Sequence, residues 1–321
     1  MSTGVYTVYT PPEHPVPALL GVVGPTASGK TDLALALARR LPIEILVADS
    51  RQVFRGMDIG TAKPDAAARA AVPHHLLDLV APDEPFTVAQ WISEARRLIG
   101  EIAARGRLAM VVGGTGLYLE ALLAGHDYEA QPWSPERRAA LVERLEAEGL
   151  ESLAAELVRR TPEVARRTDL RNPRRVLRAL ERSEGDGRLP MGEPYAGRVA
   201  LLGLSRPPSV LAERIERRAR DLFERGGLLD EVRRLMAAGY GPELRPMTGH
   251  GYREAARHLA GEWSLEQAID VTARRTRQYA KRQRTWFRRE PRILWLGAGS
   301  RPADDPSLVN EAERLVRAAL S

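Results

Sequence analysis

The feature that most restricts how this chain can fold is the stretch Gly24-Pro25-Thr26-Ala27-Ser28-Gly29-Lys30-Thr31. It fits the pattern G-x-x-x-x-G-K-[ST], in which backbone amides of a glycine-rich loop surround phosphate oxygens. An apolar, strand-like run precedes it at residues 18–23, and Leu33, Leu37 and Leu41 follow it at helical spacing. A buried strand, this loop and a helix N-terminus, in that order, predict a P-loop that binds a di- or triphosphate.

Two side chains of the loop have expected roles. Lys30 is positioned to neutralise phosphate charge, and Thr31 to offer its hydroxyl group to a bound Mg²⁺ ion. The alternative is a chance glycine turn, which the flanking strand and helix patterns disfavour.

Four further apolar runs predict strands at residues 43–48, 108–112, 199–204 and 293–296. Uninterrupted apolar strands that alternate with helices indicate an α/β fold with a parallel sheet covered on both faces. One such helix places five apolar residues on a single face, namely Trp91, Ala95, Leu98, Ile99 and Ile102. We therefore expect a P-loop NTPase-like core over residues 18–119 and 199–321, after a flexible N-terminus at 1–17.

Residues 120–198 contain no strand pattern and predict an all-helical insertion domain of three or four short helices. Ser134-Pro135 and Asn172-Pro173 resemble helix starts, with a cap residue followed by proline. Glycine and proline between residues 185 and 197 predict a loop back to the core. The expected buried residues are Leu141, Leu145, Leu150, Leu153, Leu157, Val158, Val176, Leu177 and Leu180.

Polar residues follow the predicted strands where each strand ends. Asp49-Ser50-Arg51-Gln52 comes after the second strand and Gly113-Gly114-Thr115-Gly116 after the third. Because ligands bind at the carboxyl ends of parallel strands, Asp49 and Thr115 should lie near the phosphate site. Asp49 could hold Mg²⁺ through water or accept a proton from a nucleophile; capping its own turn is the structural alternative.

Two other polar residues are further candidates for this site. Lys63 is expected on the same rim as Asp49. Arg253 follows a glycine-rich approach that suggests delivery to the cleft, although an ordinary solvated helix arginine fits the sequence too.

Composition limits the class of protein. The chain has no cysteine, which excludes disulfides and thiolate sites, and its six histidines lack metal-ligand spacing. His74-His75 is expected to be a loop pair. No apolar run approaches the ~18–20 residues of a membrane span, and residues 1–17 lack a signal pattern. We expect a cytoplasmic monomer with no membrane contact.

Positive charge is concentrated near the C-terminus. Residues 274–292 contain nine basic residues and one acid, Glu290, while the net charge of the whole chain is only +6. Unpaired cations repel one another and favour a polyanionic partner. Tyr279, Trp286 and Phe287 lie among them and suit stacking on unpaired bases, which indicates an RNA ligand.

Together these motifs resemble the tRNA dimethylallyltransferase (tRNA isopentenyltransferase) family. The resemblance runs in unbroken order over about residues 18–297, and the block from Asp49 to Pro64 is its most specific part. It extends through residues 112–118, the Gly251-Tyr252-Arg253-Glu254 turn and the basic segment at 281–288.

The resemblance implies transfer of a dimethylallyl group from dimethylallyl diphosphate to N6 of the adenosine 3′ of the tRNA anticodon, with release of pyrophosphate. It implies that Gly24, Pro25, Thr26, Ala27, Ser28, Gly29, Lys30 and Thr31 bind the diphosphate with help from Mg²⁺. Asp49 matches the general base, Thr115 lines the adenosine side, and Arg253 lies near the pyrophosphate. The helical insertion matches the domain that clamps the anticodon stem-loop.

The resemblance also implies the residues that contact tRNA. They are Asp49, Ser50, Arg51, Gln52, Thr115, Arg138, Arg174, Arg175, Val176, Leu177, Arg178, Thr248, Gly249, His250, Gly251, Tyr252, Arg253, Lys281, Arg282, Gln283, Arg284, Thr285, Trp286, Phe287 and Arg288. This chain departs from the family pattern at His250, where an aliphatic residue is usual, and at Phe54, where tyrosine is common.

Two rival functions fit parts of the sequence. In a P-loop small-molecule kinase, Asp49 would orient a substrate hydroxyl, but the basic aromatic segment would be unexplained. In a non-enzymatic P-loop RNA-binding module, Asp49 would be dispensable.

Overall fold

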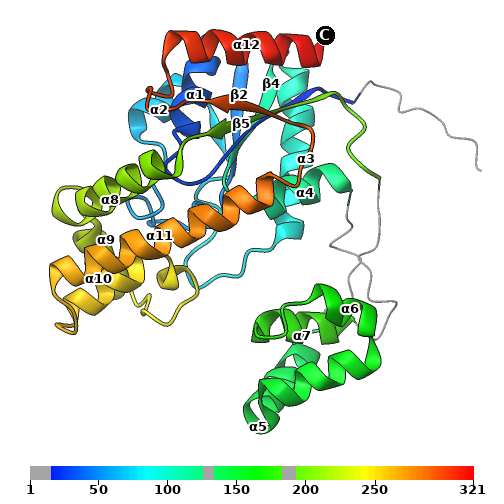
Figure 1. Ribbon diagram of the computed structural model, residues 1–321, viewed down its shortest axis with the longest axis vertical. Helices are drawn as coiled ribbons and strands as arrows, with labels where there is room; N and C mark the ends of the chain where they lie inside the picture. The colour runs from blue at the N-terminus through cyan, green and yellow to red at the C-terminus, as the bar shows by residue number, and fades with distance from the viewer. Residues whose placement is uncertain (1–15, 126–133, 183–192) are drawn as a thin grey trace, which may run out of the picture. The chain divides into compact units, whose positions relative to one another are not determined.

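The computed structural model describes residues 16–125, 134–182 and 193–321 (Figure 1). Most of the expected N-terminal lead-in and of the expected loop at 185–197 lies outside these residues. The chain divides into two compact units. The sheet unit comprises the residues up to Leu123 and those from Tyr195 onward, and the helical unit comprises Ala124–Pro194.

The sheet unit contains a six-stranded parallel sheet with the strand order β3-β2-β4-β1-β5-β6. Its strands are β1 (Leu19–Val23), β2 (Ile43–Ala48), β3 (His74–His75), β4 (Leu108–Gly113), β5 (Val199–Ser205) and β6 (Ile293–Gly297). The expected α/β fold and its five strands are confirmed. The prediction of a loop pair at residues 74–75 was wrong, because a two-residue edge strand has no periodicity to detect.

The register of the sheet brings the polar strand ends to one edge. Val23 is level with Gly113 of β4 on one side and with Gly203 of β5 on the other. Ala48 of β2 is also paired with Gly113. The loops that follow β1, β2, β4 and β5 therefore leave the sheet side by side, as the sequence predicted.

Helices cover both faces of this sheet (Figure 1). Helices α1 (Lys30–Ala38) and α12 (Pro306–Leu320) share a core with Leu20 and Val22 of β1. Gly21 faces the opposite side, where Leu119 of α4 (Gly116–Ala124) approaches it. Helix α3 (Val88–Ala104) packs on β4, and all five residues of its predicted apolar face are buried.

A second core joins four helices to the chain after β2. Helices α8 (Pro208–Glu224), α9 (Leu228–Ala237), α10 (Tyr252–Leu259) and α11 (Leu265–Phe287) pack together with residues 53–57. Figure 1 shows α11 as a long helix beside α8, with α9 and α10 next to them. Two short elements, α2 (Ala66–Ala71) and the 3₁₀ turn η1 (Pro246–Thr248), complete the unit.

The helical unit contains α5 (Pro135–Arg160), α6 (Pro162–Arg167) and α7 (Pro173–Arg182). Two expected helices are merged in α5, which is kinked at Gly149, where φ is 80°. Leu153, Leu157 and Val176 form a small core. The expectation that Val158 is buried was wrong, because this side chain lies on the outer face with 44% of its surface exposed.

Candidate active site

Three adjoining cavities lie at the carboxyl edge of the sheet. The wide cavity has a volume of about 410 Å³, and the inner cavity beside it has about 90 Å³. A side cavity of about 470 Å³ adjoins the inner one. The wide and inner cavities share Thr26, Asp49, Thr61 and Arg218, and the inner and side cavities share Lys30, Thr31, Ala62, Pro64 and Arg218.

The P-loop forms one wall of the inner cavity. Ala27 and Gly29 adopt positive φ angles of 63° and 95°, which bend the loop directly into the N-terminus of α1. The hydroxyl oxygen of Ser28 is buried and has no hydrogen-bond partner among the described residues. Burial lowers the pKa of Lys30 to about 8, against the attraction of Asp49. An unpartnered hydroxyl, a helix N-terminus and a desolvated ammonium group suit a bound anion.

Three side chains from distant elements hold this loop. Gln283 of α11 accepts a hydrogen bond from the Thr26 amide at 2.8 Å. Arg214 of α8 donates to the carbonyl oxygen of Ala27 at 2.8 Å, and Arg206, after β5, donates to that of Ser28 at 2.6 Å. The loop conformation therefore depends on parts of the chain about 180 to 260 residues away.

The ends of β2 and β4 meet as expected from the sequence. The backbone amide of Ser50 donates to the Thr115 hydroxyl at 3.3 Å, and that of Arg51 donates to Oδ1 of Asp49 at 2.9 Å. Asp49 lines both the wide and the inner cavity. Its carboxylate is therefore accessible from the two sides.

Arg218 is a candidate site residue that the sequence interpretation missed. It lines all three cavities. Burial lowers the pKa of its guanidinium group, while Asp49 and Asp32 favour the charged form. The sequence did contain a signal for Arg218. Arg214 and Arg218 are one turn apart on a helix that follows the end of a strand, where ligands bind in parallel sheets.

The wide cavity collects many of the residues expected to contact RNA. His250 and Tyr279 form a tilted ring pair with centroids 5.4 Å apart, and the Arg282 guanidinium lies 5.7 Å from the Tyr279 ring. Burial lowers the pKa of His250 to about 4, assisted by Arg275, Arg282 and Arg51. Of the expected RNA contacts, those lining this cavity are Asp49, Ser50, Arg51, Thr248, Gly249, His250, Tyr252 and Arg282.

The side chains of the basic segment at 274–292 are not all exposed and unpaired, as the sequence suggested. Arg275 is paired with the buried carboxylate of Glu254, so its charge is compensated within the fold. Phe287 was expected to stack on bases but is only 1% exposed and belongs to the interior. Trp286 is 39% exposed. Lys281, Arg282, Arg284 and Arg288 make no ion pair among the described residues.

Arg253 does not reach the cavities. It is exposed on α10 and lines none of the three, whereas its neighbour Tyr252 lines the wide cavity. Tyr252 is buried at the start of α10 and Arg253 is exposed beside it, whereas Arg218 lines all three cavities.

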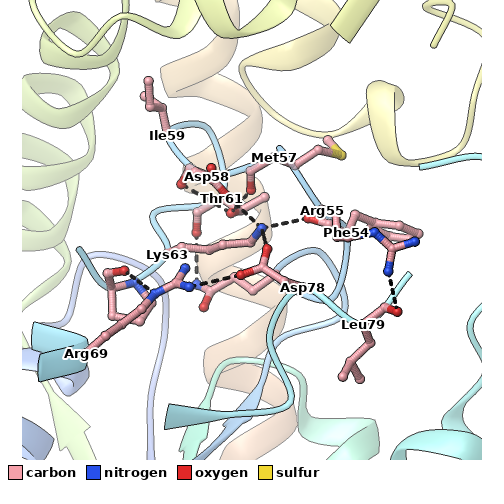
Figure 2. A network of polar contacts seen from close by, with 12 residues as sticks. Phe54, Arg55, Met57, Asp58, Ile59, Thr61, Lys63, Arg69, Asp78 and Leu79 are labelled. Atoms are coloured by element: carbon pink, nitrogen blue, oxygen red, sulfur yellow. Dashed lines mark hydrogen bonds and ion pairs between the residues drawn. The ribbon is translucent and has the colours of Figure 1, made fainter. Parts of the chain in front are cut away.

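Lys63 lines the side cavity, but its ammonium group points away from it into a polar network (Figure 2). Its ammonium group donates to the Phe54 carbonyl oxygen at 2.6 Å and to Asp58 at 2.7 Å, and it is also paired with Asp78. Figure 2 shows this side chain pointing into the polar network between residues 54 and 79. Lys63 therefore braces the long loop after β2.

In the helical unit, the predicted RNA contacts fall into three groups. Arg174 and Arg175 are exposed on α7. Val176 and Leu177 are buried, at 0% and 3% exposure, so their side chains are core residues and cannot touch RNA in this conformation. Arg138 and Arg178 both pair with the buried carboxylate of Glu181, at 2.9 and 3.1 Å.

Oxygen donors for a divalent cation are present beside the P-loop. The Thr31 hydroxyl and the Asp49 carboxylate both line the inner cavity, and such hard donors suit Mg²⁺. Within the described ranges, no three His, Cys, Asp or Glu side chains gather as a metal cluster. None of the described helices is long and apolar enough to span a membrane.

Comparisons with known proteins identify the family of this chain. The model of the family described as IPP transferase matches residues 52–290. A tRNA dimethylallyltransferase of Roseiflexus castenholzii is 46% identical over 304 residues, which cover 93% of this chain and 97% of the relative. Another, from Syntrophobacter fumaroxidans, is 45% identical over 306 residues, covering 92% of this chain and 86% of the relative.

Two solved structures are similar as well. The tRNA isopentenylpyrophosphate transferase of Bacillus halodurans has a TM-score of 0.71 and 37% identity, and the match covers 94% of this chain and 96% of that one. A eukaryotic dimethylallyltransferase, described as acting on tRNA, has a TM-score of 0.76 and 27% identity; that match covers 94% of this chain and 78% of the other.

Proposed function

The chain belongs to the tRNA dimethylallyltransferase family, and from this premise we propose how its sheet unit transfers a dimethylallyl group to tRNA. The enzyme moves the group from dimethylallyl diphosphate to N6 of the adenosine 3′ of the anticodon and releases pyrophosphate. The observation that carries the assignment of the site is that Asp49 and Arg218 line both the wide and the inner cavity.

Each of these two cavities binds one of the two substrates. The diphosphate occupies the inner cavity, where P-loop amides, Lys30 and Arg218 surround it. The adenosine enters the wide cavity, whose walls carry Ser50, His250 and Tyr279. Because this cavity is recessed, the base must leave its stack in the anticodon loop, as in other enzymes that extrude a base.

The transfer breaks one C–O bond and forms one C–N bond. The N6 lone pair is delocalised into the purine, so the amine is a weak nucleophile and needs a base for its proton. N6 attacks C1 of the dimethylallyl group, the C1–O bond electrons leave with pyrophosphate, and Asp49 accepts the N6 proton. Lys30, Arg218 and the P-loop amides stabilise the charge on the leaving pyrophosphate.

A magnesium ion fits the donors beside the P-loop. Thr31 would hold it, with the diphosphate supplying further oxygens, and Asp49 stays free to accept the N6 proton. Mg²⁺ would supply additional neutralisation of the leaving pyrophosphate.

The RNA contacts extend beyond the cavity. Lys281, Arg282 and Arg284 on α11, and Arg288 directly after it, offer uncompensated charge to phosphates. The exposed Arg174 and Arg175 offer charge on the helical unit. We assign the helical unit to binding of the anticodon stem-loop. The protein acts as a monomer in the cytoplasm in this proposal.

The test is a prenyl-transfer assay with labelled dimethylallyl diphosphate, unmodified tRNA and Mg²⁺. The wild type should label the RNA, and Asp49→Asn, which keeps the shape but cannot accept the proton, should lower kcat by about 10²–10⁴-fold. RNA binding by the variant should be unchanged. Equal rates for both proteins would remove Asp49 from its role, and ATP turnover without RNA labelling would favour a kinase.

A further inference from the structure

Gln283 connects three parts of the active site through one buried side chain. Its Oε1 accepts a hydrogen bond from the Thr26 amide at 2.8 Å, and its Nε2 donates to the carbonyl oxygen of Gly114 at 2.8 Å. Gln283 is 6% exposed. Both ends of the Gln283 side chain are therefore used.

The fit around this amide is tight. A Cβ atom at Gly114 would lie 2.2 Å from Nε2 of Gln283, and one at Gly113 would lie 2.0 Å from the Ala48 carbonyl oxygen. Backbone and side chain can approach so closely only because residue 114 has no side chain. Packing as well as the turn therefore explains why glycine stands at the end of β4 and directly after it.

The two loops that Gln283 joins carry the two halves of the reaction. Thr26 belongs to the loop assigned to the diphosphate. Gly114 precedes Thr115, whose hydroxyl accepts from the amide next to Asp49. The Gln283 amide therefore links the loop that holds the leaving group to the loop beside the base Asp49, and it helps to set the distance between them.

Gln283 also lies on the helix that presents charge to RNA. Its neighbours Arg282 and Arg284 make no ion pair among the described residues. A helix is rigid over one turn, so a change in the position of these arginines moves Gln283 with them.

We propose that Gln283 is a positioning residue that couples tRNA binding on α11 to the conformation of the diphosphate loop. This inference rests on the proposed function, because it takes α11 as an RNA contact. When RNA binds the arginines of α11, Gln283 holds the Thr26 amide and the Gly114 carbonyl at the spacing the reaction needs. By linkage, the diphosphate site then binds its ligand more tightly when tRNA is present.

The test measures the affinity for inorganic pyrophosphate with and without unmodified tRNA, using wild type, Gln283→Met and Gln278→Met. Methionine keeps the length of glutamine but removes both hydrogen bonds, and Gln278 is an exposed residue of the same helix. tRNA should strengthen pyrophosphate binding by at least about fivefold in the wild type and in Gln278→Met. The enhancement should be lost in Gln283→Met. Because Gln283 is buried and its amide is bonded within the fold, it does not reach RNA as the sequence suggested, and the tRNA affinity of the diphosphate-free variant should be unchanged.

Kinetic measurements distinguish a positioning role of Gln283 from a folding defect of its variants. Gln283→Met should lower kcat and raise KM for dimethylallyl diphosphate, while the tRNA affinity of the diphosphate-free enzyme and the circular dichroism spectrum stay unchanged. Gln283→Glu can accept from Thr26 but cannot donate to Gly114, so it should not restore kcat. Gly114→Ala displaces the same amide and should reproduce the Gln283→Met defect, without adding to it in the double variant.

The outcomes distinguish this inference from the proposed function. Prenyl transfer with intact coupling in Gln283→Met would overturn the role of Gln283 and leave the transferase standing. No transfer by the wild type would instead contradict the proposed function. A wild type in which tRNA leaves pyrophosphate affinity unchanged would also overturn the coupling.

Discussion

The Tyr252 hydroxyl donates a hydrogen bond to Oε1 of Glu231 at 2.5 Å, joining the start of α10 to α9. The same carboxylate accepts from the backbone amides of Asp58, Ile59 and Gly60, at 2.9, 2.7 and 3.2 Å. One buried group therefore organises the loop after β2 and orients Tyr252, which lines the wide cavity.

Glu231→Gln should destabilise the sheet unit. The amide group of glutamine cannot accept the hydrogen bonds that both oxygens of Glu231 receive, and hydrogen bonds to a charged acceptor contribute about 1.5–3 kcal/mol each. We expect the free energy of unfolding to fall by about 2–3 kcal/mol, measured by urea denaturation. Glu262→Gln, at an exposed carboxylate, is the control. A loss under about 0.5 kcal/mol, typical of surface changes, would contradict this.

Binding of the diphosphate should weaken at alkaline pH. Burial lowers the pKa of Lys30 to about 8, so the free enzyme loses this charge as the pH rises through that value. The protonated form attracts the diphosphate, and kcat/KM for dimethylallyl diphosphate should therefore fall by about tenfold per pH unit above this pKa. Lys30→Arg remains charged throughout and should not show this inflection. A flat profile for the wild type would exclude Lys30 as the titrating group.

His250 should contribute to RNA binding as a neutral ring. Burial and three nearby arginines lower its pKa to about 4, so protonation occurs only near that value. KM for tRNA should consequently be flat between pH 5.5 and 7.5. His250→Phe keeps the ring beside Tyr279 and should retain KM, whereas His250→Val should raise it by a few-fold, about 1 kcal/mol of stacking. An inflection near pH 6.5 that disappears in His250→Phe would show that the ring titrates.

RNA affinity should depend steeply on salt, because uncompensated arginines of α11 replace counterions on the phosphates. Arg284→Gln and Arg288→Gln should each reduce the slope of log affinity against log salt by about 0.7. Arg97→Gln is the control, since Arg97 is already paired with Glu94 and Glu101. Filter binding at several salt concentrations measures the slope. Equal slopes for all four proteins would exclude these α11 arginines as phosphate contacts.

The fold followed from local patterns along the chain. A P-loop between an apolar strand and a helix, followed by alternating strands and helices, is sufficient to predict a parallel sheet. The carboxyl ends of such strands share one edge, so the proximity of Asp49 to Thr115 could also be predicted. These inferences succeeded because strand and helix periodicities depend on neighbouring residues.

Mispredicted residues share one cause. Phe287 and Val176 lie in basic segments of the kind that bind RNA, yet both side chains are buried. Arg253 is exposed, whereas its neighbour Tyr252 is buried. A sequence pattern shows which residue types lie together, but the direction of each side chain depends on where its helix packs.

The P-loop, the parallel sheet and the family resemblance can be read from the chain without its structure, because each depends on short contiguous segments. The packing of distant elements is what brings Arg218 to all three cavities and places Gln283 between Thr26 and Gly114. These relationships link residues far apart in the chain. They exist only after α8 and α11 have packed beside the loops of the sheet, because a hydrogen bond needs its partners within about 3 Å.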